Sequence, residues 1–124
     1  MSRPIEPDFE VSTERIGGDG RIVAVRGEID VYTAPELRDA LKQALDAGCV
    51  RVVIDLGGTT FVDSSGLGVL VGAYRRLRDR GGALAIVNDD RDIARTFEIT
   101  GLDELLPIAG TRDEAVAALD GRSP

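Results

Sequence analysis

The segment VRVVIDL at residues 50–56 is the stretch of sequence that indicates the fold. It is rich in β-branched residues and shows little alternation between polar and apolar side chains, which is typical of a strand covered by helices on both faces. Such strands belong to parallel sheets, in which a helix lies in each crossover connection. We therefore expect an α/β fold built around this strand.

The residues before this strand predict a hairpin and a helix. Residues 9–16 and 21–28 alternate between polar and apolar side chains and are separated by the turn sequence GGDG, so they predict an antiparallel pair of strands. The sequence TAPE at residues 33–36 has the pattern of a capping box, in which the Thr33 hydroxyl accepts a hydrogen bond from the N–H of Glu36. The apolar periodicity that follows predicts a helix that ends near Gly48.

The residues after the strand predict a loop over 57–63 and then a regular alternation of helices and strands. The further elements are expected as a helix from Ser64 to about Arg80, a strand over 83–87, a helix over 90–100, a short strand over 105–108 and a helix over 112–119. The order β-β-α-β-α-β-α-β-α implies a single α/β domain with a mostly parallel mixed sheet, an N-terminal hairpin and flanking helices. We expect this domain at residues 9–120, with a flexible leader at 1–8 and a tail at 121–124.

The composition excludes several classes of function. The chain has 124 residues and a net charge of −7, which is the wrong sign for a protein that binds nucleic acid or anionic lipid. It has no histidine, so Ser-His catalysis and histidine metal ligation are excluded, and the single Cys49 cannot form an internal disulfide. We expect a cytoplasmic protein with no signal peptide, no membrane span, no cofactor and no metal.

The sequence Asp63-Ser64-Ser65-Gly66 is the strongest candidate for a site, because binding surfaces in α/β sheets form where strands end and helices begin. A helix cap at Asp63 or Ser64 is the simplest interpretation. A catalytic serine would lack a base, and a dinucleotide loop at 66–68 would lack its third glycine, since Val71 holds that position. Phosphorylation of Ser64 is chemically permitted, because a helix N-terminus favours an anion. Local chemistry leaves the cap and the phosphorylation site both open.

Several motifs together carry a resemblance to a known family. They are RGEID at 26–30, TAPEL at 33–37, VIDL at 53–56, FVDSSGLGVL at 61–70 and ITGL at 99–102. In this order and spacing they resemble the sulfate transporter and anti-sigma factor antagonist (STAS) domain. More narrowly, they are similar to the bacterial stand-alone anti-sigma factor antagonists, which are also called anti-anti-sigma factors.

The resemblance implies a regulatory binding protein that is not an enzyme. In that family the unphosphorylated protein binds an anti-sigma factor that is also a serine kinase, and so frees a sigma factor for transcription, as in stress responses. Phosphorylation of the first serine of DSSG, here Ser64, ends the binding, and a PP2C-type phosphatase restores it. By position, the resemblance assigns these residues to partner binding: Asp30, Thr33, Asp63, Ser64, Ser65, Gly66 and Leu67.

Two other interpretations remain open from the sequence. The chain is alternatively a STAS module that binds a different partner without a phosphorylation cycle, as a stress-signalling scaffold or a transporter accessory subunit would. A third interpretation is a small nucleotide-binding protein whose binding residues are Ser64 and the arginines at 75, 76, 78 and 80. Those arginines are otherwise explained as a solvated helix end, where cations suit the helix dipole.

Overall fold

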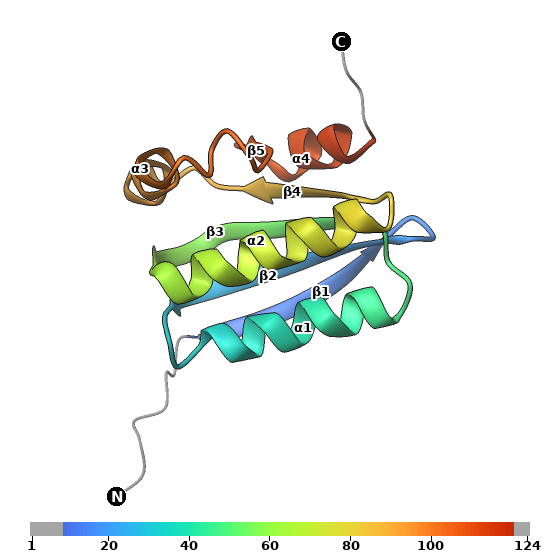
Figure 1. Ribbon diagram of the computed structural model, residues 1–124, viewed down its shortest axis with the longest axis horizontal. Coiled ribbons are helices and arrows are strands. Elements are labelled where there is room, and N and C mark those ends of the chain that lie inside the picture. The colour runs from blue at the N-terminus through green and yellow to red at the C-terminus, as the bar shows by residue number, and fades with distance from the viewer. Residues whose placement is uncertain (1–8, 121–124) are drawn as a thin grey trace, which may run out of the picture.

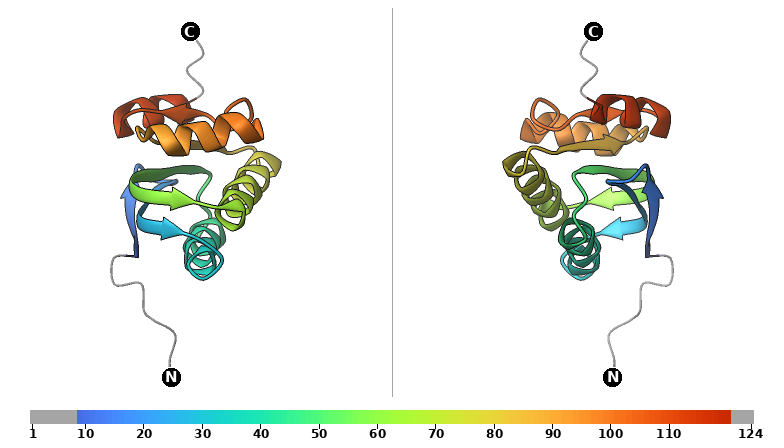
Figure 2. Two further views of the ribbon diagram at one scale, coloured as in Figure 1. Left: turned by 90° about the vertical axis from the view of Figure 1, so that its left-hand side faces the viewer. Right: turned by 90° about the vertical axis from the view of Figure 1, so that its right-hand side faces the viewer.

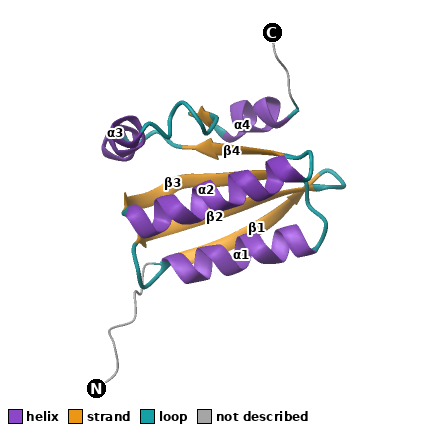
Figure 3. Cartoon of the chain, viewed as in Figure 1, coloured by secondary structure: helices purple, strands orange, loops and turns teal. Residues whose placement is uncertain are grey.

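The order of strands and helices is the predicted one in the computed structural model, which describes residues 9–120 (Figures 1 and 3). The elements are β1 (Glu10–Ile16), β2 (Gly20–Ile29), α1 (Ala34–Asp46), β3 (Arg51–Val62), α2 (Ser64–Asp79), β4 (Ala83–Val87), α3 (Arg91–Thr100), β5 (Ile108–Ala109) and α4 (Arg112–Leu119). The leader predicted at 1–8 and the tail predicted at 121–124 lie outside the described residues.

The strands form one mixed sheet in the order β1-β2-β3-β4-β5. β1 is antiparallel to β2, and the pairs β2/β3, β3/β4 and β4/β5 are parallel. The hairpin and the parallel crossovers predicted from the sequence are therefore both confirmed. α1 and α2 lie side by side against one face of the sheet, with their axes roughly along the strands (Figures 1 and 2).

The central strand β3 contributes to a core on each face of the sheet, as its apolar sequence predicts. Val52 and Ile54 belong to the larger core, which packs against α1 and α2 and includes Phe97 of α3. Val53, between them, points to the opposite face and packs in the smaller core with Leu119 of α4. All five side chains are at most 5% exposed. This two-sided burial makes β3 the central strand of the fold.

The predicted loop at 57–63 is wrong over most of its length, because β3 continues to Val62. The pairing register with β2 shifts twice in this region, between Ala24 and Arg26 and between Gly27 and Glu28, and each shift leaves one extra residue on β3. Glycines in a strand often mark such bulges instead of a turn. Thr59 is buried and donates to the carbonyl oxygen of Val25 at 2.9 Å, which ties the bulged segment to β2.

The predicted capping box at Thr33 is also wrong, although α1 does begin at Ala34. The Thr33 hydroxyl makes no cap hydrogen bond. It donates to the carbonyl oxygen of Glu28 at 2.7 Å and accepts from the N–H of Asp30 at 2.9 Å. The side chain is 4% exposed, so tertiary burial directs it toward the end of β2 and away from its own helix.

The short strand predicted at 105–108 is displaced to Ile108–Ala109. α3 ends at Thr100, and the next residue, Gly101, has a φ of 77°, the left-handed conformation expected of a glycine that ends a helix. The chain then turns, and the N–H of Leu106 donates to the carbonyl oxygen of Leu102 at 2.8 Å. Leu106 is buried in this turn. The apolar run therefore supplies a core residue from a turn and pairs with β4 only afterwards.

Candidate functional site

The site predicted around Ser64 lies where β3 ends and α2 begins. Asp63 is the N-cap of α2, and one oxygen of its carboxylate accepts from the N–H groups of Ser65 at 2.8 Å and Gly66 at 3.2 Å. Ser64 is the first residue of the helix and is exposed. Its hydroxyl makes no hydrogen bond with the described residues, so it is open to a partner.

The predicted acids Asp30 and Asp63 emerge next to each other from neighbouring strands. Ile29 and Val62 are paired in the parallel ladder, and the N–H of Asp63 donates to Ile29 O at 3.1 Å. One carboxylate oxygen of Asp30 accepts from the N–H groups of Tyr32 at 2.9 Å and Thr33 at 3.0 Å. Both carboxylates therefore accept hydrogen bonds from backbone N–H groups just after their strands, at the carboxyl ends of β2 and β3. Asp and Asn commonly do this in turns.

Gly66 sets how closely α2 approaches the sheet. A Cβ at this position would lie 2.6 Å from Cγ2 of Ile29 and 2.9 Å from Cγ1 of Val62. Real side chains do not tolerate such contacts, so a glycine is needed for the first turn of α2 to sit on the ends of β2 and β3. This close approach fixes the position of Ser64 relative to the loop after β2.

The seven residues that the sequence assigned to partner binding gather at this one corner, but they differ in exposure. Ser64 is exposed, and Asp30, Asp63 and Ser65 are partly exposed. The other three, Thr33, Gly66 and Leu67, are buried. The structure therefore gives these three a supporting position beneath the surface formed by the first four.

Sequence reasoning missed three exposed apolar side chains that lie close to the site residues in the chain. Val31 is 60% exposed, Tyr32 65% and Phe61 48%. Val31 and Tyr32 follow Asp30 in the loop after β2, and Phe61 precedes Asp63 by two residues on β3. Large apolar side chains grouped at a surface commonly mark a protein interface. The sequence did contain a signal for two of them. Val31 and Tyr32 are adjacent large apolar residues that follow a strand and fit neither the alternation of that strand nor the periodicity of the next helix.

The comparison with known proteins shows the family of the chain. Residues 10–115 match the STAS domain family, a range that begins with β1 and runs into α4. The chain belongs to the STAS domain family. Its relatives include the anti-sigma-B factor antagonist of Listeria monocytogenes, which is 39% identical over 92 residues, covering 74% of this chain and 81% of that protein.

Solved structures of STAS proteins share the fold. An anti-sigma factor antagonist from Mycobacterium paratuberculosis superposes with a TM-score of 0.83 and 30% identity, over 94% of this chain and 97% of that one. The Bacillus cell fate determinant SpoIIAA, solved in its phosphorylated form, superposes with a TM-score of 0.69 at 22% identity, over 88% of this chain and 98% of that one. The second likeness shows the fold alone.

Within this STAS fold, two glycines and two of the four arginines considered for nucleotide binding have structural explanations. Gly66 and Gly68 lie inside α2, so they form no phosphate-binding loop. Arg80 donates to the carbonyl oxygen of Leu45 at 2.7 Å, which gives this carbonyl in the last turn of α1 a hydrogen-bond partner. The Arg78 guanidinium lies 5.7 Å from the ring centre of Tyr74, within the range of a cation–π interaction. Among the described residues, no helix is long and apolar enough to span a membrane.

Proposed function

We propose that this STAS protein is an anti-sigma factor antagonist that binds an anti-sigma factor through the corner around Ser64. The observation that carries the proposal is the exposed Ser64 hydroxyl at the start of α2, together with the exposed side chains of Val31 and Tyr32 in the loop after β2 and of Phe61 near the end of β3. An apolar surface with one modifiable hydroxyl at its edge is suited to a protein interface that a charge can break. The names of the STAS relatives support the same partner class.

In this proposal the partner is also the kinase. The anti-sigma factor transfers the γ-phosphoryl group of ATP to Oγ of Ser64, with loss of the hydroxyl proton and release of ADP. A PP2C-type phosphatase then hydrolyses the phosphoserine to serine and inorganic phosphate. The cycle would run in the cytoplasm and decide whether a sigma factor is held or free. The phosphorylated form of SpoIIAA supports it at the level of the fold.

The proposed cycle is tested by mass spectrometry of the protein recovered from its native cells. Trypsin is expected to release one peptide, residues 52–75, which contains both Ser64 and Ser65, so fragment ions must place the phosphate. We expect a phosphate on Ser64 whose occupancy changes with growth condition. Ser64→Ala should abolish it, and the matched variant Ser65→Ala should retain it. An unmodified peptide, well detected under every condition, would favour a STAS module that binds without phosphorylation.

The apolar border of the site gives a separate prediction. Tyr32→Ala and Phe61→Ala are each expected to weaken binding of the unphosphorylated protein to the anti-sigma factor by about tenfold or more, since exposed aromatic side chains are frequent energetic centres of interfaces. Isothermal titration calorimetry measures the affinity, and a thermal melt checks the fold. The matched control is Thr13→Ala on β1, an exposed position on another strand. Equal affinities for all three variants would contradict an interface at this corner.

A further inference from the structure

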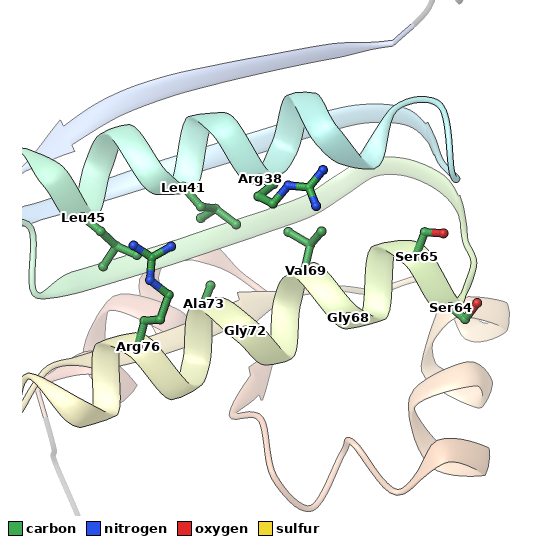
Figure 4. A pocket seen from close by; sticks show the side chains of 10 residues that line it. All are labelled: Arg38, Leu41, Leu45, Ser64, Ser65, Gly68, Val69, Gly72, Ala73 and Arg76. Atoms are coloured by element: carbon green, nitrogen blue, oxygen red, sulfur yellow. The ribbon is translucent and has the colours of Figure 1, made fainter.

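A groove lies between α1 and α2, with Ser64 and Ser65 at one end of it (Figure 4). It encloses about 430 Å³. The side chains of Leu41 and Leu45 line it from α1, and those of Val69 and Ala73 line it from α2. Leu41, Leu45 and Ala73 are at most 5% exposed, so they form the floor of the groove, and Val69 is half-buried at its side.

Two glycines on α2 keep the groove open although this chain does not require them. Gly68 and Gly72 line the groove, neither has a positive φ, and a Cβ at either position would meet nothing within 4 Å. A helix with glycine at an interior position is less stable than one with alanine. These two glycines therefore destabilise α2, and no close contact within the chain requires them. Gly66 is different, because its neighbours leave no room for a Cβ.

The rims of the groove are positively charged in a chain whose net charge is −7. Arg38 reaches over the groove from α1 near Val69, and Arg76 reaches over it from α2 near Leu45 (Figure 4). Within residues 9–120 neither guanidinium forms a salt bridge. The carboxylate of Asp46 has a lowered pKa mainly because of its hydrogen bond with Lys42, with smaller contributions from the charges of Arg76 and Arg80.

The length of the groove suits a helix better than a compact ligand. Its lining on α2 extends from Ser64 to Arg76, which corresponds to roughly 18 Å at 1.5 Å per helical residue. The two arginines lie on opposite rims and at different levels along this length (Figure 4). An occupant that uses both must therefore carry negative charges on both flanks of an elongated apolar body.

We propose that this groove is a docking site for an amphipathic helix of a protein partner, with its apolar face on Val69 and the glycine surface of α2, above the buried Leu41 and Leu45, and its acidic flanks toward Arg38 and Arg76. Helices bind such grooves through apolar side chains spaced three and four residues apart, and charge complementarity sets their orientation. The inference rests on the proposed function for the partner's identity and deepens it by stating the chemistry of the segment that the partner contributes. Because Ser64 lies at one end, a phosphate there would also repel an acidic helix.

The occupant is identified by site-specific photo-crosslinking in the native cells. The crosslinking amino acid p-benzoylphenylalanine replaces Gly68, where the structure has open space, and the matched control places it at Arg75, which is exposed on the same helix but does not line the groove. We expect position 68, and not position 75, to crosslink to a helical segment of the anti-sigma factor that has an apolar face and acidic flanks. Crosslinks to lipid, to a second copy of this chain or to a basic segment would overturn the inference, as would no crosslink above the control.

The role of charge is tested with the crosslinked segment as a synthetic fluorescent peptide. Fluorescence anisotropy should show that Arg38→Glu and Arg76→Glu each weaken its binding by about tenfold or more, and that Gly72→Leu does the same by filling the groove. The matched control, Arg75→Glu, should leave the affinity within about twofold. Circular dichroism melts establish that each variant is folded. Unchanged affinity in the two groove arginine variants would overturn the assignment.

The two proposals fail in different ways. If Ser64 is never phosphorylated but the crosslink and its charge dependence are found, the groove is a docking site and the phosphorylation cycle is wrong. If the phosphate on Ser64 changes with growth condition but position 68 gives no crosslink above position 75, the cycle stands and the groove is not the docking site.

Discussion

Phosphorylation of Ser64 is expected to weaken binding to the anti-sigma factor by about 100-fold or more while leaving the fold intact. The phosphate adds a charge of about −1.5 to −2 next to the Asp63 carboxylate. Two like charges about 4 Å apart repel by roughly 1 kcal/mol in water and by more in a partly dry interface, and each 1.4 kcal/mol corresponds to tenfold in affinity. The exposed apolar side chains of Val31, Tyr32 and Phe61 would make this interface partly dry.

The fold should tolerate the phosphate because Ser64 is exposed and lies at a helix N-terminus, where an anion is favourable. The Asp63 carboxylate already occupies the N–H groups of Ser65 and Gly66, so the phosphate need not replace any internal hydrogen bond. The measurement compares affinities and thermal melts of the unmodified and fully phosphorylated proteins. A Tm lower by more than about 10 °C would mean that the switch acts by unfolding, which would contradict this mechanism. Ser64→Ala should bind like the unmodified protein before and after treatment with the kinase.

Gly66→Ala is expected to destabilise the protein by about 1–3 kcal/mol, because the added methyl group would overlap Ile29 and Val62. Ile29 has no exposed surface and Val62 is 5% exposed, so neither can move aside without disturbing the core. Relief of the overlap would push the first turn of α2 off the sheet and displace Ser64. The variant should therefore lose affinity for the anti-sigma factor as well as stability.

Gly68→Ala is the matched control, on the same helix two residues further along. Its added methyl group would meet nothing within 4 Å, so the better helix propensity of alanine should raise stability by about 0.5–1 kcal/mol. Urea denaturation of both variants measures the difference. Equal effects of the two substitutions would show that Gly66 is not held by the close approach of α2 to the sheet.

The sequence located the start of α2, and with it the position of Ser64, because the relevant signals are local. The β-branched run at 50–56 predicts a buried strand, and a strand followed by Asp63 and an apolar helix period predicts a helix N-terminus at Ser64. The sequence allows either Asp63 or Ser64 as the N-cap, and in the structure the N-cap is Asp63, whose carboxylate accepts the cap hydrogen bonds. These features depend on residues only a few positions apart, which is the range over which propensity and capping act.

Other residues of the site could not be assigned from local patterns. Thr33 fits a capping box by spacing, but burial against the end of β2 directs its hydroxyl to Glu28 and Asp30. The glycines at 57 and 58 are typical of a turn, but both belong to β3, where Gly58 pairs with Arg26 and Gly57 lies in the first bulge. In both cases contacts with β2 take the place of the local pattern.

By itself, the sequence determined the α/β order, the buried central strand and the helix start that presents Ser64, since apolar periodicity and capping chemistry act within single elements. The tertiary structure alone decided which of the assigned residues reach the surface, and it left Val31, Tyr32 and Phe61 exposed. It also placed Arg38 and Arg76 on opposite rims of one groove, although they are far apart in the chain. The physical reason is that exposure and grooves depend on how elements pack together, and that packing involves contacts between residues that no local pattern relates.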